Sequence, residues 1–271
     1  MHTVCDVSAT PPTVFATSDP HGHLSELTAA LQQAGLLDAS SHWSGGTSRL
    51  WVLGDLVDRG PDGLGVIALV RRLVDEASAA GGAVRPLLGN HEVIALGTHL
   101  FGDTEVVHRG VVRTFESIWA RNGGLASDQA GIDDELFAWL AGLPAIGRDG
   151  DHLLMHSDTL SYLAWGSAVD DVNAAIGAVL ADDDPVAWFD VLVSLGQRHE
   201  YAGPTGPAAA RTLLAALGGQ RIVHGHSIIG DLFDEPCDSY SDPRSYADGL
   251  VLDVDGGIYE GGPCLVARLS G

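Results

Sequence analysis

Three apolar, β-branched runs in the first 90 residues each end in a short polar motif. The motifs are Asp19-Pro20-His21-Gly22, Gly54-Asp55-Leu56-Val57-Asp58-Arg59-Gly60 and Gly89-Asn90-His91-Glu92. The spacing of apolar residues predicts strands at 13–17, 50–53 and 84–88, and helices at 24–36 and 64–80. This order predicts a βαβαβ core of parallel strands, with all three motifs at the carboxyl edge of the sheet, where such cores bind ligands.

The second half of the chain adds histidines after two further apolar runs. A predicted strand at 152–155 ends at His156, and the run 221–223 leads into His224-Gly225-His226. Residues from about 93 to 140 lack an obvious strand and predict a helical cap beside the site. The remainder, with runs at 250–254 and 264–269, resembles an antiparallel second sheet. We expect one domain over residues 1–271.

The residue types in these motifs are metal ligands. Asp, Asn and His bind divalent cations, and a carboxylate has two oxygens with which it can bridge a pair of them. Clustered at strand ends, such side chains can hold two cations about 3.5–4 Å apart. That arrangement suits in-line attack of a metal-bound hydroxide on a phosphoryl group.

The ordered motifs resemble those of the calcineurin-like metallophosphoesterases, and within them the phosphoprotein-phosphatase (serine/threonine phosphatase-like) branch. The resemblance extends from about residue 15 to 260. It implies an α/β fold in which a two-sheet β-sandwich is flanked by helices in four layers (α/β/β/α), with a helical cap insertion. It also implies a metal-dependent phosphoric monoester hydrolase with two divalent metal ions. We expect manganese, with iron, zinc, cobalt or nickel as alternatives, because these ligands suit all of them.

The resemblance also implies a role for each motif residue. Asp19 and His21 would bind the first metal, and Asp55 would bridge both. The second site would be completed by Asn90, His156 and His226.

The remaining motif residues would act on the substrate. His91 would be the general acid that protonates the leaving oxygen, and Asp58 would orient it. Arg59 would hold the phosphoryl oxygens through its planar guanidinium, assisted by Asn90.

Two further residues have open roles. Arg198 precedes a Gly/Pro-rich loop at 203–207 that could pass over the site, so it is a candidate second phosphate ligand; the alternative is a surface arginine. His224 is a candidate metal ligand, although Gly225-His226 fits the family pattern better. The alternative is that His224 supports a ligand or packs in the core.

Departures from the branch pattern bear on the substrate. Ser157-Asp158 follows His156 where protein phosphatases of this branch have Gly-Gly, Ser18 replaces a glycine, and residues 236–241 replace the usual C-terminal loop. We therefore expect the substrate to be a phosphomonoester of a small molecule, a nucleotide or a sugar phosphate. A metal-bridging hydroxide would attack it directly, without a phosphoenzyme, because no cysteine nucleophile is suitably placed.

Three alternatives remain from the sequence. The chain could be a serine/threonine phosphoprotein phosphatase, or it could hydrolyse a nucleotide phosphoanhydride such as a dinucleoside polyphosphate. Bacterial diadenosine-tetraphosphate hydrolases share the plan but usually lack the acid before the motif arginine, so Asp58 disfavours that subgroup. The third alternative is a metal-binding scaffold that recognises a phosphorylated partner without turnover. The presence of both Asp58 and His91 disfavours it, because binding alone needs no general acid.

Composition limits the partners. The formal net charge is −22 over 271 residues, which argues against binding nucleic acid or an anionic membrane. The three cysteines, Cys5, Cys237 and Cys264, form no Cys-x-x-Cys pair, and we find neither a signal-peptide pattern nor a run long enough to span a bilayer. We expect a cytoplasmic protein that acts on a phosphorylated small molecule.

Overall fold

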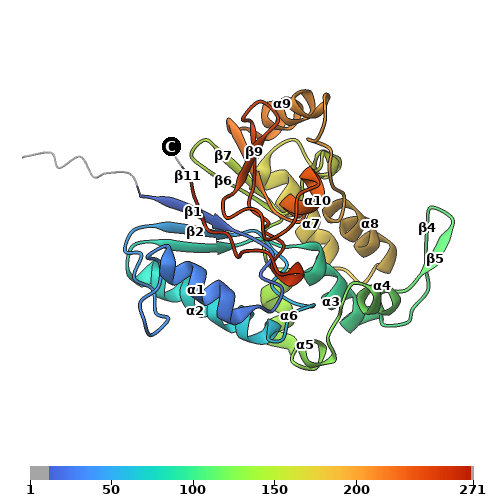
Figure 1. Cartoon of the computed structure of the whole chain (residues 1–271). Coiled ribbons are helices and arrows are strands. Elements are labelled where there is room, and N and C mark those ends of the chain that lie inside the picture. Colours follow the sequence, from blue (N-terminus) through green and yellow to red (C-terminus); the bar gives the residue numbers. More distant parts are fainter. Residues whose placement is uncertain (1–11, 270–271) are drawn as a thin grey trace, which may run out of the picture.

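Two β-sheets packed face to face form the centre of the computed structural model, which describes residues 12–269 (Figure 1). Cys5 and the expectation about a signal peptide lie outside the described residues. The first sheet has the strand order β11-β1-β2-β3, with β1, β2 and β3 parallel. Its strands are β1 (Val14–Thr17), β2 (Arg49–Val52), β3 (Ala83–Pro86) and β11 (Ala267–Leu269).

The second sheet is mixed, with the order β6-β7-β8-β10-β9. Its strands are β6 (Ile146–Asp149), β7 (His152–Met155), β8 (Arg221–His224), β9 (Arg244–Tyr246) and β10 (Val251–Asp253). The central strands β7, β8 and β10 are parallel, and the two edge strands are antiparallel to their neighbours. The sequence-based expectation of an antiparallel second sheet therefore holds for its two edge strands and was wrong for the central strands. The long helical connection from β7 to β8 allows a parallel crossover, and the last strand, β11, pairs with β1 instead.

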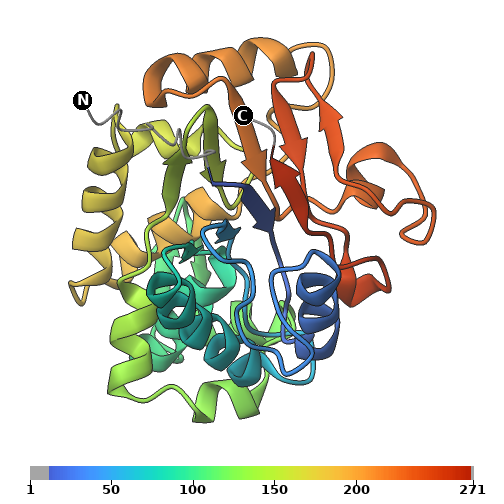
Figure 2. The same ribbon diagram turned by 90° about the vertical axis from the view of Figure 1, so that its left-hand side faces the viewer.

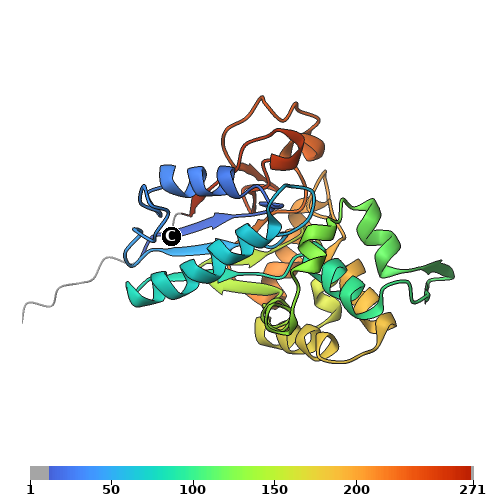
Figure 3. The same ribbon diagram turned by 90° about the horizontal axis from the view of Figure 1, so that it is seen from below.

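Helices cover the outer faces of both sheets. In the views of Figures 1 and 3, α1 (Leu24–Gln33) and α2 (Gly63–Ala79) lie on the first sheet. Helix α7 (Val169–Leu180) contacts β6, and α9 (Gly206–Leu217) contacts β8 above the second sheet in Figure 2. The remaining elements here are α8 (Pro185–Leu195), α10 (Ile229–Phe233) and the 3₁₀ turns Ser161–Ala164 and Ile258–Glu260. The predicted α/β sandwich is confirmed.

A cap follows β3. It contains α3 (Asn90–Phe101), α4 (Phe115–Arg121), α5 (Ala126–Ala130) and α6 (Asp134–Ala141). It also contains a hairpin, β4 (Val106–His108) and β5 (Val111–Arg113), where the sequence predicted only helices. The hairpin projects from the body in Figures 1 and 3. Its cause is local: paired valines flank Arg109-Gly110, both at positive φ, as a two-residue hairpin turn requires.

Within residues 12–269, none of the helices has both the length and the apolar character that crossing a bilayer demands.

The contact between the sheets includes one close fit. Trp51 of β2 is buried and donates its indole N–H to Asp149 of β6 at 3.0 Å. Opposite its ring stands Gly147, where an added Cβ would lie 2.3 Å from the ring carbons. A residue without a side chain at this point lets the two sheets approach across the tryptophan.

We expect Gly147→Ala to lower the free energy of unfolding by about 1–3 kcal/mol, because the methyl group overpacks the Trp51 ring. In a Trp51→Phe background the ring is smaller and leaves room for the methyl group. Gly147→Ala should then lower the free energy of unfolding by less. Urea denaturation of the four proteins measures both values. Gly177→Ala in α7 is the control, since its Cβ would meet no atom within 4 Å, and it should be neutral or stabilising. Equal costs in both backgrounds would refute the contact as the cause.

Candidate active site

The polar motifs all lie at strand ends on one side of the sandwich. Asp19 follows β1, Asp55 follows β2 and Asn90 begins α3 after β3. From the second sheet, His156 follows β7 and His226 follows β8. Five segments far apart in the sequence thus converge where the carboxyl ends of parallel strands meet, as the sequence predicts.

The backbone of this region is strained. Six of its residues adopt positive φ angles, between 42° and 67°, that side chains with a Cβ rarely take: Asp19, His21, Asp55, Asp58, Arg59 and His226. Such conformations persist only where the surrounding structure holds them, and they gather at functional sites.

Backbone contacts between loops hold that geometry. His21 N–H donates to the Asp55 carbonyl at 2.9 Å, and Gly22 N–H donates to the Leu56 carbonyl at 3.0 Å. A Cβ on Gly22 would meet the Gly60 carbonyl oxygen at 2.8 Å, so the first two loops touch main chain to main chain.

The Glu92 carboxylate ties the second loop to the third. It accepts backbone N–H groups from Asp55 at 2.9 Å, Leu56 at 2.7 Å and Gly89 at 2.8 Å. Glu92 is fully buried, and three donors satisfy most of its acceptor capacity there. Its place in the Gly-Asn-His-Glu motif is therefore structural.

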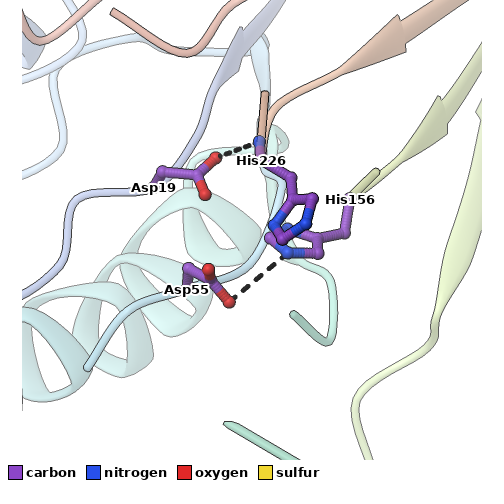
Figure 4. A group of neighbouring side chains, drawn as sticks. All are labelled: Asp19, Asp55, His156 and His226. Carbon is purple, nitrogen blue, oxygen red and sulfur yellow. Dashed lines mark hydrogen bonds and ion pairs between the residues drawn. The ribbon is translucent and has the colours of Figure 1, made fainter. Parts of the chain in front are cut away.

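Two groups of possible metal donors share one carboxylate. The first contains Asp19, Asp55, His156 and His226, whose donor atoms lie within 4.8 Å of one another (Figure 4). The second contains His21, Asp55 and His91. Asn90 Oδ1 lies 2.9 Å from His156 Nε2 and adds an oxygen to the first group. The sequence assigned Asp19 and His21 to one metal, whereas the geometry groups Asp19 with the later histidines.

Two of these histidines are held in the tautomer that metal binding needs. Nδ1 of His21 bonds the Val57 carbonyl at 3.0 Å, and Nδ1 of His156 bonds the Leu53 carbonyl at 2.8 Å. A carbonyl only accepts, so each Nδ1 carries the proton and each Nε2 lone pair faces Asp55, at 3.6 Å and 3.4 Å respectively.

Burial makes this group of side chains electrostatically costly. It raises the pKa of Asp19 to about 7 and raises the pKa of Asp55 well above its ordinary value, with Glu92 adding to the latter. It lowers the pKa of His21 and of His226 well below the ordinary value, so these imidazoles stay neutral. Bound cations would stabilise the ionised carboxylates and so lower their pKa values. The neutral imidazole is the form that binds a metal ion. The donor set fits divalent metal ions.

His91 is fixed at one ring nitrogen and free at the other. Its Nδ1 lies 2.8 Å from Asp58 Oδ2, while its buried Nε2 has no hydrogen-bond partner among the described residues. The cap holds Asp58 in turn: Trp119 Nε1 donates to Oδ1 at 3.2 Å, and the Asp58 N–H donates to Asp128 at 3.1 Å. Burial raises the pKa of Asp58 to about 6 and lowers the pKa of His91.

Arg59 is held from two sides. Its Nε donates to the Asn122 carbonyl at 3.3 Å, and its guanidinium lies 3.9 Å from the centre of the Tyr259 ring. Tyr259 also meets the His21 ring edge to face, with centroids 5.1 Å apart. Its ring is therefore a shared wall between the arginine and a possible metal ligand.

Arg198 and His224 have different surroundings. Arg198 reaches the site, with Nη2 2.9 Å from His226 Nε2. Its loop is anchored by Asp158, which accepts the His199 N–H at 2.8 Å, so this departure from the family pattern positions the arginine loop. The buried His224 uses both ring nitrogens elsewhere, on the Gly225 carbonyl at 2.8 Å and the Tyr246 hydroxyl at 2.7 Å. Within residues 12–269 it joins neither donor group.

Sequence reasoning missed four residues of this region. Trp119, Asp128 and Tyr259 come from the cap and the C-terminal segment, and no motif marks them. Asp255, whose pKa burial raises, is the exception: it follows the predicted strand at 250–254 and precedes Gly256-Gly257, the strand-end pattern that revealed the other carboxylates.

A cavity of about 330 Å³ opens from the donor groups toward the cap. Asn90, Arg198 and His226 line it, together with residues of α3, α4, β5 and α8. The loop 203–207, which the sequence placed over the site, is not among the cavity's described lining residues.

Comparisons with known proteins agree with this geometry. The model of the calcineurin-like phosphoesterase family matches residues 12–230. The Shewanella-like protein phosphatase 2 of Arabidopsis thaliana is 34% identical over 110 residues, 41% of this chain and 27% of that protein. A symmetrical bis(5'-nucleosyl)-tetraphosphatase of Pectobacterium carotovorum is 30% identical over 179 residues, 66% of this chain and 54% of that enzyme. The chain thus spans about a quarter to a half of these relatives.

A solved structure shares the fold. The cold-active protein-tyrosine phosphatase of a psychrophilic Shewanella species superposes with a TM-score of 0.71 and 24% identity, covering 96% of this chain and 76% of that one. The family model matches residues 12–230, which is more than half of the chain, and this match shows the family. The chain belongs to the calcineurin-like phosphoesterase family.

Proposed function

We propose that the chain hydrolyses phosphomonoesters of a small molecule at a dinuclear metal centre. One observation carries the proposal: Asp55 belongs to both donor groups, so its carboxylate can bridge two cations. Membership of the family supports a phosphoesterase hydrolase with bound metal.

Bound cations would supply Lewis acidity and lower the pKa of a water molecule that attacks phosphorus. Asp19, His156, His226 and Asn90 would hold one ion, His21 would hold the other, and Asp55 would join them. The neutral imidazoles add affinity without adding negative charge, which leaves the site attractive to a phosphate dianion.

His91 would deliver the proton that the leaving oxygen needs. Its Nδ1 is bonded to Asp58, so the proton to be given away is at the unpartnered Nε2. Burial disfavours an imidazolium here, and the Asp58 carboxylate offsets that cost. Neither Arg59 nor Arg198 forms a salt bridge within residues 12–269. Both guanidinium groups would therefore be available to hold phosphoryl oxygens.

The cavity favours a small substrate. Its volume of about 330 Å³ is at the lower end of the range for small-molecule sites, and the cap forms one of its walls. The net charge of −22 should also repel acidic phosphopeptides, most strongly at low ionic strength.

A second candidate is cleavage of a nucleotide phosphoanhydride. The similarity to a symmetrical bis(5'-nucleosyl)-tetraphosphatase favours it. The same donor groups would serve either bond, and the difference would lie in how the leaving group is protonated and held. A diphosphate leaving group needs less help from His91 than an alkoxide does.

Asp55→Asn should abolish the shared carboxylate and reduce bound metal from two ions to one or none per chain. Elemental analysis of protein reconstituted with manganese and freed of excess metal measures this stoichiometry. Asp184→Asn is the matched control: Asp184 is exposed, caps α8 and belongs to neither donor group, and asparagine also caps helices. Two ions retained in Asp55→Asn would contradict the bridging role.

His91→Gln and Asp58→Asn should lower kcat by about 10²–10⁴-fold on an alkyl phosphate while metal content stays near that of the wild type. The loss on p-nitrophenyl phosphate should be much smaller, because nitrophenolate leaves without a proton. Steady-state kinetics on the two substrates separates these effects. Equal losses on both would remove His91 from the acid role, and absence of manganese-dependent turnover in the wild type would favour a binding scaffold.

Small phosphomonoesters should have higher kcat/KM than peptides. We would compare nucleoside monophosphates, sugar phosphates and dinucleoside tetraphosphates with phosphoserine, phosphothreonine and phosphotyrosine peptides, all at physiological salt. A tetraphosphate ranking first would favour the second candidate. A phosphopeptide ranking first would show that the cavity does not exclude protein substrates.

A further inference from the structure

The cavity beside the donor groups has an unusual charge for this protein. The sequence contains 36 acidic residues against 14 basic ones, all arginine. Yet three arginines and no described acidic residue line this cavity: Arg113, Arg121 and Arg198. Four other cavities of the described structure each include at least one acidic side chain. A local excess of positive charge in a strongly acidic chain indicates an anionic ligand.

Arg113 and Arg121 are not needed to hold the scissile phosphate. Arg198 lies against His226, and Arg59 stands beside Tyr259 and His21. These two, with Asn90, already supply the donors for one phosphoryl group. Arg113 ends β5 and Arg121 ends α4, so both come from the cap instead of the metal-donor loops.

The side chains of Arg113 and Arg121 remain available to a ligand. Both residues are exposed, and neither forms a salt bridge in the part of the chain that the structure describes. Arg121 donates Nε to the Ser117 carbonyl at 3.2 Å, which orients the guanidinium, and its terminal NH₂ groups have no hydrogen-bond partner within residues 12–269. By contrast, Arg71, Arg72 and Arg211 are each paired with a carboxylate.

Apolar side chains complete the lining. Ile94 and Ile118 come from α3 and α4, and Phe189, Leu192 and Val193 come from α8 across the cavity. These walls can contact an uncharged, apolar part of a ligand. The lining therefore combines a catalytic phosphate site, an apolar surface and a second cationic site.

We infer that the substrate carries a second anionic group, phosphate or carboxylate, which binds Arg113 and Arg121 while its apolar body lies against Phe189 and Ile118. This inference rests on the proposed function and narrows its substrate class. A guanidinium pair matches the oxygens of either anion, and the contact acts on binding because these arginines are apart from the donor groups.

Linear alkanediol bisphosphates test the inference as molecular rulers. For chains of three to eight carbons, we would compare kcat/KM of each bisphosphate, divided by two for its equivalent ends, with that of the alkyl monophosphate of equal length. We expect an advantage of about 10-fold or more at one optimal length, carried by KM, and weakening with added salt. In Arg113→Gln/Arg121→Gln, the ratio of the two substrates should fall toward one. An ω-phosphoryl carboxylate series identifies which anion is preferred.

Arg109→Gln is the matched control, because Arg109 is exposed on the same hairpin but does not line the cavity. It removes one charge and should leave the substrate ratio unchanged. No bisphosphate advantage at any length, or an equal loss on both substrates in the double variant, would overturn the inference. So would an acidic phosphopeptide that outperforms every bisphosphate and loses that advantage in the double variant.

The second anion site can be tested even if the proposed function is wrong. If metal-loaded protein turns over neither substrate, calorimetric binding of the same bisphosphate and monophosphate pairs still tests the second site. Tighter binding of the bisphosphate that disappears in the double variant would support it, and equal binding would overturn it.

Discussion

The three hydrogen bonds accepted by Glu92 hold the site together. They fix the main chain of Asp55 and Leu56 against that of Gly89, across the ends of two neighbouring strands. A Cβ on Gly54 would lie 2.6 Å from the Gly89 nitrogen, so the approach tolerates no side chain there. Parallel strands bring these loops to one edge, but only such contacts fix them closely enough to place donor atoms within a few ångströms of one another.

The cap contacts both the proposed acid and the cavity. Through Trp119 and Asp128 it holds Asp58, and thereby His91. Through Arg113 and Arg121 it lines the cavity that leads away from the donor groups. A change in the cap would therefore alter both the orientation of the proposed acid and the fit of the substrate, whereas the strand-end loops, with Asn90 at the start of α3, would set metal binding.

The sequence predicted the parts of the fold that local patterns encode. Strand runs, turn residues and motif order predicted the βαβαβ core and the convergence at the strand ends, whereas the two-sheet sandwich was implied by the resemblance to the family. The hairpin at 106–113 was missed because its valines lie within a long helical region, although Arg109-Gly110 is a turn signal. Trp119 and Tyr259 could not be found, because their contacts with Asp58 and Arg59 join segments that only the tertiary structure brings together.

The left-handed backbone of the site residues has a consequence for how this family can diverge. Each such conformation costs about 1–3 kcal/mol for a residue with a Cβ, and glycine relieves it. Substitution of Asp19 or Asp55 by glycine would thus remove a candidate metal donor, relieve backbone strain and delete a buried carboxylate. It would also leave the His226 or the His91 backbone N–H without its present acceptor. The net change in stability is then the strain relieved minus the cost of a buried N–H that has lost its acceptor. A lineage that loses either carboxylate therefore also loses a hydrogen bond that fixes the main chain of a neighbouring loop.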